Sequence, residues 1–250
     1  MELYKKRTWI TGASSGIGAA TARLLAKKGS EVVLSARRIN RLNELAEEIK
    51  SQDGKAIVKA LNVSDRKAVE QLGEELEDMG GVDILVNNAG LMPLAPMLEG
   101  RVDEWEKIID VNIKGVLYAI NAVLPGMAKR KKGHIVNLGS VAGRVTFQGS
   151  AVYCGSKFAV RAISDTLRKE ATNYGVRVTD IQPGSVATEL ADSIGFEPAR
   201  KAVTSMQGFY GPGKEILQAE DIASAILYAV TQPDRVNVCE VLVRPKIQEF

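Results

Sequence analysis

Residues that hold metal ions or act as nucleophiles are scarce in this chain. It contains one histidine, His134, and two cysteines, Cys154 and Cys239, which are far apart in the sequence. These three residues do not show the ligand spacing of a zinc site, and His134 begins an apolar strand instead of lying near Cys154. The sequence therefore predicts no metal site, and we expect both cysteines to be small buried thiols.

Long apolar runs and a strong excess of one charge are also missing. The net charge is +3, from 33 basic and 30 acidic residues, and the one basic run, at 129–132, is typical of a solvated helix end. No apolar run approaches the ~20 residues of a membrane span, and Met1 leads into a strand without a signal-peptide pattern. We therefore expect a cytoplasmic protein that binds neither nucleic acid nor membranes.

The 250 residues have the composition of a soluble globular protein, with 45% hydrophobic and 25% charged side chains. Strand-like apolar runs alternate with amphipathic helical patterns, which is typical of a parallel sheet with helices on both faces. The expected fold class is α/β, a single Rossmann-like doubly wound domain over residues 1–250 with seven parallel strands. Strands are expected at 9–10, 31–36, 55–60, 82–90 (with the exit from the strand), 134–138, 176–181 and 238–243.

A glycine-rich turn follows the first strand. Thr11 begins the run TGASSGIG, in which Gly12, Gly16 and Gly18 have the spacing GxxxGxG, and a helical pattern continues to Gly29. Glycines let a backbone approach an anion closely, and the free amides and positive pole of a helix N-terminus attract it. The turn therefore predicts a phosphate cradle.

The end of the second strand indicates which dinucleotide is bound. A site for NAD would place a carboxylate about 20 residues past the glycines, on the ribose hydroxyls. Ala36 stands there instead, and Arg37 follows. A guanidinium grips a 2′-phosphate in a contact worth roughly 1.5–3 kcal/mol, about 10- to 150-fold in affinity. We therefore predict NADP(H), with Arg37 as the main clamp and Ser14 and Arg38 as helpers.

Tyr153 and Lys157 form a second constellation. Four residues apart on a helix, they point from the same face, and Ser140 closes an apolar strand thirteen residues earlier. A phenol has a pKa of about 10, but a cation about 4 Å away at an effective dielectric near 20 interacts with it by roughly 4 kcal/mol, or about three pKa units. A lone YxxxK is a weak motif. With the rest of the chain, it predicts an acid–base pair beside a substrate oxygen held by Ser140.

The chain resembles the short-chain dehydrogenase/reductase family, in the branch whose members have about this length. The motifs TGxxxGxG, NNAG at 87–90, VNIKG at 111–115, YxxxK and PGxVxT at 183–188 carry the resemblance, which covers essentially the whole chain. It implies four catalytic residues. Ser140 would stabilise the developing oxyanion, Tyr153 would deliver the proton, Lys157 would lower the tyrosine pKa and bind the nicotinamide ribose, and the main chain at Asn112 would sustain a proton relay.

The same resemblance implies contacts along the whole cofactor. Asn62, where the family usually has aspartate, would lie beside the adenine, whereas Asn87 is expected to pin neighbouring strands. Val186 and Thr188 would hold the nicotinamide carboxamide. The cofactor-binding residues expected are Gly12, Ser14, Ser15, Gly16, Ile17, Gly18, Arg37, Arg38, Asn62, Val63, Asn88, Ala89, Gly90, Tyr153, Lys157, Pro183, Gly184, Val186 and Thr188.

The expected activity is reversible hydride transfer between NADP(H) and a carbonyl or alcohol. Several stretches are similar to NADP-dependent 3-hydroxy acid (serine-type) dehydrogenases and to clavulanate-aldehyde reductases, which implies a small hydroxy acid, aldehyde or ketone as substrate. Arg144 is either a grip for a substrate carboxylate beside Ser140 and Tyr153 or a surface loop arginine. The glycine-rich residues 189–214 are expected to form a mobile substrate lid.

Two other functions stay open on the sequence. A 3-oxoacyl-[acyl-carrier-protein] reductase would share all the catalytic residues. A catalytically silent NADP-binding module usually loses the tyrosine or the lysine, and both are present here. The resemblance also implies a homotetramer, with a dimer as the alternative, in which the small residues Ala159, Ala162 and Ser164 allow two long helices to approach their mates closely.

Overall fold

A seven-stranded parallel sheet organises the computed structural model, which describes residues 3–205, 213 and 215–248. The strand order is β3-β2-β1-β4-β5-β6-β7, so the chain reverses its direction of winding between β1 and β4. This topology confirms the predicted Rossmann-like fold. The strands are β1 (Arg7–Thr11), β2 (Glu31–Ala36), β3 (Lys55–Ala60), β4 (Ile84–Asn87), β5 (Gly133–Leu138), β6 (Val176–Pro183) and β7 (Glu240–Val243).

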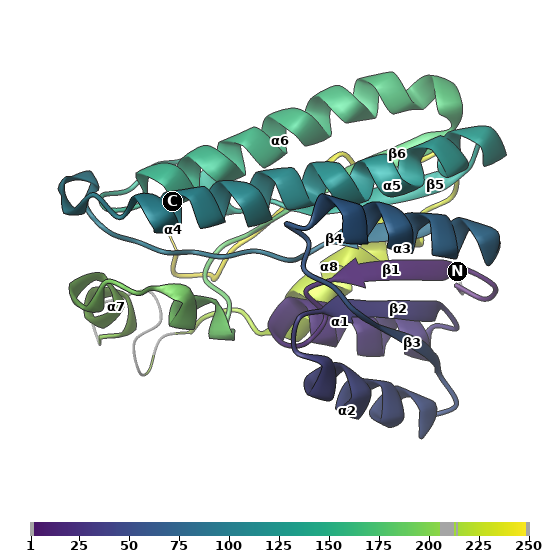
Figure 1. Ribbon diagram of the computed structural model, residues 1–250, viewed down its shortest axis with the longest axis horizontal. Helices are drawn as coiled ribbons and strands as arrows, with labels where there is room; N and C mark the ends of the chain where they lie inside the picture. Colours follow the sequence, from purple (N-terminus) through teal and green to yellow (C-terminus); the bar gives the residue numbers. More distant parts are fainter. Residues whose placement is uncertain (1–2, 206–212, 214, 249–250) are drawn as a thin grey trace.

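Helices cover both faces of the sheet (Figure 1). One layer contains α3 (Arg66–Asp78), α4 (Val102–Ile109), α5 (Gly115–Arg130) and α6 (Ala151–Ala171), and the other contains α1 (Gly16–Lys27), α2 (Ile39–Lys50) and α8 (Ala219–Val230). The short helix α7 (Glu197–Thr204), green in Figure 1, lies to one side of these layers. A π-helical turn, Asp110–Lys114, joins α4 to α5.

The two helical layers enclose separate hydrophobic cores. Successive residues of a strand point to opposite faces of a sheet. On β1, Ile10 packs into the core shared with α1, α2 and α8, whereas Trp9 packs into the core shared with α3, α5 and α6. Both side chains are fully buried, as expected for strands covered on both faces.

The continuous helical run Val102–Arg130 is, among the described residues, the one long and apolar enough to pass for a membrane span on length and composition. Core helices of soluble proteins pass the same test. Here Val116, Ile120 and Val123 pack in the core with α3 and α6, which accounts for the apolar composition of the run.

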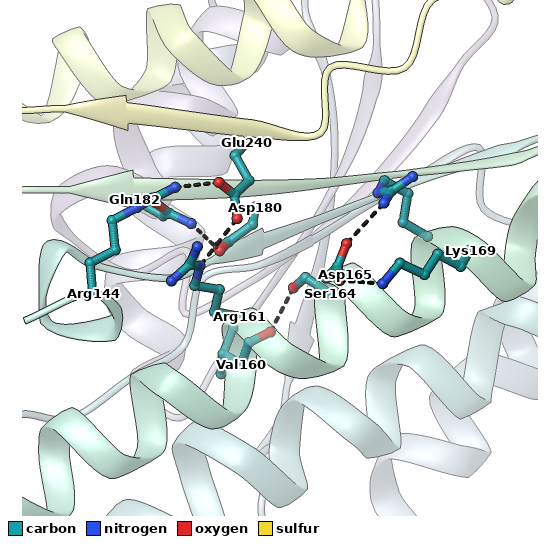
Figure 2. A network of polar contacts seen from close by, with 10 residues as sticks. Arg144, Val160, Arg161, Ser164, Asp165, Lys169, Asp180, Gln182 and Glu240 are labelled. Carbon is teal, nitrogen blue, oxygen red and sulfur yellow. Dashed lines mark hydrogen bonds and ion pairs between the residues drawn. The ribbon is translucent and has the colours of Figure 1, made fainter.

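Two expectations about small residues need correction. Cys154 is buried as predicted, but Cys239 is exposed, because it lies just outside the edge strand β7. Ser164 faces the sheet and not a partner helix: Asn137 Nδ2 donates to its Oγ (2.8 Å), which in turn donates to Val160 O (2.7 Å; Figure 2). Ala162 is exposed on the same helix.

His134 has a structural role within the sheet. The hydroxyl of Thr179 donates to Val238 O (2.6 Å), so His134 Nε2, 2.7 Å from Thr179 Oγ1, is the donor of that bond. The side chain is buried, and burial, together with the charge of Arg177, lowers the pKa of His134 to about 3. The imidazole is therefore neutral in the folded protein at ordinary pH.

We expect His134 to make the folded state sensitive to acid. The unfolded pKa is about 6.5, so between pH 6.5 and about 3 the unfolded chain binds one more proton than the folded chain. The contribution of neutral His134 to the free energy of unfolding is fully present above pH 6.5. It is lost as the pH falls, by up to about 1.4 kcal/mol per pH unit. Urea unfolding at several pH values should show a steeper loss for wild type than for His134→Gln; parallel losses would contradict the assignment.

Candidate active site

A cleft of about 530 Å³ opens at the carboxyl ends of the strands, around the point between β1 and β4 where the winding reverses. Ligands of doubly wound sheets bind at this position. Most of the residues singled out from the sequence line this cleft, whereas Gly18, Asn112 and Arg144 do not. The lining residues among them are Gly12, Ser14, Ser15, Gly16, Ile17, Arg37, Arg38, Asn62, Val63, Asn88, Ala89, Gly90, Ser140, Tyr153, Lys157, Pro183, Gly184, Val186 and Thr188.

The glycine turn has the geometry of an anion cradle. Gly12 and Gly16 adopt φ angles of 66° and 51°, which disfavour any side chain. A Cβ on Gly18 would lie 2.5 Å from Asn88 Nδ2, so this glycine serves close packing beneath the cleft. The N-cap residue of α1, Ser15, makes no side-chain capping bond, and the first turn of α1 contains no acidic residue. The positive end of α1 is therefore available to a phosphate.

Two arginines lie on the cleft where β2 ends. The side chain of Arg37 makes no hydrogen bond or ion pair with the described residues, so its guanidinium is available to a ligand. Arg38 is engaged: it donates to Ser14 Oγ (3.2 Å), Ser15 Oγ (2.6 Å) and the carboxylate of Glu189 (2.7 Å). Cationic side chains beside the helix terminus, without the carboxylate that NAD sites carry, fit a cofactor with a 2′-phosphate.

Asparagines hold the floor of the cleft together. Asn88 Nδ2 donates to the carbonyls of Thr11 (3.0 Å) and Gly12 (3.1 Å), which ties the exit of β4 to the glycine turn. Asn87 Nδ2 donates to Asn137 Oδ1 (2.9 Å), so Asn87 links β4 to β5 as expected. These bonds join segments that would otherwise meet only through the sheet ladder.

Tyr153, Lys157 and Ser140 meet at the other end of the cleft. Tyr153 and Lys157 lie on the first turns of α6 and are buried, and Lys157 Nζ donates to Leu138 O (2.7 Å) at the end of β5. Ser140 Oγ accepts from Ala142 N (3.1 Å) and makes only a long contact with Pro183 O (3.5 Å). The serine hydroxyl can therefore turn to a substrate oxygen at small cost.

The charge on Lys157 depends on two opposing influences. Burial lowers the pKa of Lys157 to about 8, and the carboxylate of Asp180 on β6 partly opposes this shift. Asp180 is itself buried, and its burial raises the pKa of its carboxyl group to about 6. At neutral pH the lysine is still mostly protonated, so it places a buried positive charge at this end of the cleft.

Asn112 supports the site from behind the cleft. It lies in the π-helical turn between α4 and α5, the kind of helical irregularity that often occurs at functional sites. Its Nδ2 donates to Leu91 O (2.9 Å) and Ser156 Oγ (3.1 Å), and its Oδ1 accepts from Leu91 N (2.9 Å). The side chain thus fastens the loop after β4 to α6, a link that sequence spacing does not reveal.

Arg144 does not line the cleft, so of its two expected roles the grip for a substrate carboxylate is not supported. Its guanidinium donates to Gln182 Oε1 and forms an ion pair with Glu240, which also binds Arg161 (3.2 Å; Figure 2). Glu240 opens the edge strand β7, which pairs with β6, the strand of Gln182, so both partners of the arginine lie at this edge of the sheet. Arg144 therefore belongs to a polar network at the sheet edge.

Residues 189–214, the expected lid, are only partly described. Glu189–Ser193 forms a 3₁₀ turn and Glu197–Thr204 forms α7, whereas 206–212 and 214 lie outside the described residues. Met92 N donates to Ser193 Oγ (2.9 Å), so the start of this segment contacts the loop after β4. Leu190, Asp192 and Ser193 line the cleft.

Comparison with known proteins identifies the family. The family described as short chain dehydrogenase matches residues 6–198. An uncharacterized oxidoreductase of Staphylococcus saprophyticus is 46% identical over 244 residues, 96% of each chain. This chain belongs to the short-chain dehydrogenase family and is an oxidoreductase by that membership.

Two further similar proteins have more informative names. A serine dehydrogenase solved in its closed form with NADP⁺ is 35% identical, with a TM-score of 0.88 over 98% of this chain and 96% of that one. A glycine betaine reductase of Emericella nidulans is 43% identical over 240 residues, which are 95% of this chain but 18% of that much longer protein.

Proposed function

We propose that this protein is an NADP(H)-dependent oxidoreductase that interconverts a carbonyl and an alcohol, with Tyr153 as the acid–base group. The observation that carries the proposal is that Tyr153, Lys157 and Ser140 share one cleft with the glycine turn and Arg37. Similarity to a serine dehydrogenase complexed with NADP⁺ supports the choice of cofactor.

The residues divide the chemistry between them. When bound, the reduced nicotinamide supplies the hydride that the carbonyl carbon accepts. Ser140 holds the carbonyl oxygen as negative charge develops on it, and the Tyr153 phenol donates the proton to that oxygen. Lys157, protonated below its pKa of about 8, stabilises the phenolate that remains. In alcohol oxidation the same groups work in reverse.

We expect Arg37→Ala to raise the KM for NADPH by about 10- to 150-fold, because the variant loses a charge-assisted contact with the 2′-phosphate. The KM for NADH should not change, since NADH lacks that phosphate. Steady-state kinetics with both cofactors measures the effect. Arg66→Ala, which removes an exposed arginine paired with Glu70 on α3, is the matched control. Equal efficiency of the wild-type protein with NADH and NADPH would contradict the cofactor assignment.

A substrate panel tests the reaction type. It includes 3-hydroxy acids, amino alcohols and simple secondary alcohols in the NADP⁺-linked direction. Two of the similar proteins are named for serine and for glycine betaine, which supports the inclusion of amino alcohols and amino aldehydes. Oxidation of at least one class, with NADP⁺ reduced in equal amount, is expected; an absence of turnover across the panel would leave only a nucleotide-binding role.

A further inference from the structure

One of the two carboxylates that line the cleft has no partner among the described residues. Five charged side chains line it in the described part of the chain, namely Arg37, Arg38, Lys157, Glu189 and Asp192. Glu189 is bound by Arg38 (2.7 Å) and Arg41 (2.6 Å), and Lys157 by Leu138 O. Asp192 alone among the lining carboxylates has no hydrogen bond or ion pair with the described residues. Its negative charge is therefore available to a ligand.

Asp192 lies at the Tyr153 end of the cleft. Its neighbours Ala191 and Ile194 are buried in one cluster with Tyr153 and Met92. Glu189, at the start of the same 3₁₀ turn, points instead to the arginines at the end of β2. The 3₁₀ turn thus runs from the cofactor end of the cleft, at Glu189, to the catalytic end. Asp192 lies in the part of the turn that is next to the Tyr153 cluster.

Within residues 3–205, 213 and 215–248, Lys157 is the one positive side chain that lines the catalytic end of the cleft, and it forms no ion pair with Asp192. Arg144 is held by Gln182 and Glu240 outside the cleft, and Lys157 is buried in the cleft wall, where its ammonium donates a hydrogen bond to Leu138 O. Phe147 and Met92 supply an aromatic and an apolar surface there. A substrate carboxylate would meet repulsion from Asp192, whereas a cation would meet a counter-ion and an aromatic face.

We propose that the carbonyl substrate carries a cationic amine close to the reacting carbon, with Asp192 as its counter-ion and Phe147 as part of its apolar wall. This inference rests on the proposed function and narrows its substrate class to ammonium- or trimethylammonium-bearing aldehydes and ketones. The reaction is the one proposed above. The carbonyl carbon gains the hydride of NADPH, the oxygen gains the Tyr153 proton, and NADP⁺ and the amino alcohol are the products.

Two aldehydes of equal shape test the charge of the substrate. Trimethylammonioacetaldehyde and 3,3-dimethylbutanal differ in one atom, a cationic nitrogen against a neutral carbon. The ammonium group also withdraws electrons from the carbonyl, so the contact with Asp192 is measured by the change in the kcat/KM ratio of the two aldehydes when Asp192 is replaced. Because Asp192 is exposed, we expect it to raise the kcat/KM ratio of the cationic to the neutral aldehyde by about tenfold, the low end for a charge-assisted contact. The preference should shrink as the ionic strength rises.

Asp192→Asn is the decisive variant, since it keeps the shape of an exposed side chain that has no described partner. We expect it to reduce the cation-to-neutral kcat/KM ratio about tenfold, which leaves only the difference in intrinsic reactivity of the two aldehydes. Asp78→Asn, which changes an exposed aspartate at the far end of α3, should keep the wild-type ratio. Glyoxylate, an anionic aldehyde, should be the poorest of the three substrates for the wild-type protein.

The outcomes separate the two proposals. Turnover of 3,3-dimethylbutanal with no preference for the cationic aldehyde, or a preference that Asp192→Asn leaves intact, overturns the inference about substrate charge while the proposed reaction stands. Failure to turn over any carbonyl or alcohol removes the proposed function, and the inference with it.

Discussion

Tyr153→Phe is expected to lower kcat for carbonyl reduction by about 10²- to 10⁴-fold, while NADPH still binds. The variant removes the hydroxyl that donates the proton, and a positioned acid contributes a factor of this size. The ring remains to pack with Met92 and Ala142, so the fold should persist. Steady-state kinetics gives kcat, and quenching of NADPH fluorescence gives the dissociation constant.

A second tyrosine provides the control for this experiment. Tyr174 is exposed in the 3₁₀ turn after α6 and does not line the cleft, so Tyr174→Phe should keep full activity. Undiminished turnover by Tyr153→Phe would end the assignment of Tyr153 as the acid–base group. Loss of NADPH binding together with activity would point instead to a structural defect.

Lys157→Met is expected to lower kcat for alcohol oxidation at neutral pH by about 10²- to 10³-fold. Tyr153 and Lys157 line the same cleft. A cation about 4 Å from a phenol lowers the phenol pKa by up to about three units, so the variant should hold far less phenolate to accept the alcohol proton. The alkaline pH at which oxidation reaches half its maximum should rise accordingly. Methionine is apolar and similar in length, so it suits a position that is already buried.

The pH profile distinguishes this electrostatic effect from a loss of packing. A purely structural role for Lys157 would lower kcat at every pH without shifting the profile, which would contradict the expected outcome. Lys169→Met, on an exposed turn of the same helix, should leave both kcat and the profile unchanged, since Lys169 pairs with Asp165 at the surface. Thermal unfolding of both variants reports on the fold.

Features that depend on neighbours in the chain could be predicted from the sequence. The GxxxGxG turn and the Tyr153–Lys157 pair are each set within a few residues, where strand and helix geometry fixes which side chains share a face. The hydrophobic period also indicated a parallel sheet with two helical layers. The expected role of Asn87 in pinning strands is met by its bond to Asn137, whereas the bonds of Asn88 to the glycine turn were not predicted.

Features that depend on distant partners could not be predicted in this way. Arg38 binds Glu189, which is 151 residues away, and Arg144 binds Glu240, which is 96 residues away. Long side chains such as arginine have many rotamers of similar energy, so the partner that tertiary structure brings within reach selects the direction. For the same reason nothing in the local pattern marked Asp180 as the charge beside Lys157.

The sequence by itself determined the order of strands and helices, the phosphate-binding turn, the absence of an acid after β2 and the tyrosine–lysine pair. These follow from residue spacing and from backbone preferences that act over one turn or one strand. Only the tertiary structure decided which charged side chains face the cleft. Arg37 and Asp192 have no side-chain partner among the described residues, Arg38 is bound to Glu189, and Arg144 is turned to the sheet edge. The physical reason is that Coulomb attraction and burial depend on distance in space, which packing of the two layers on the sheet establishes.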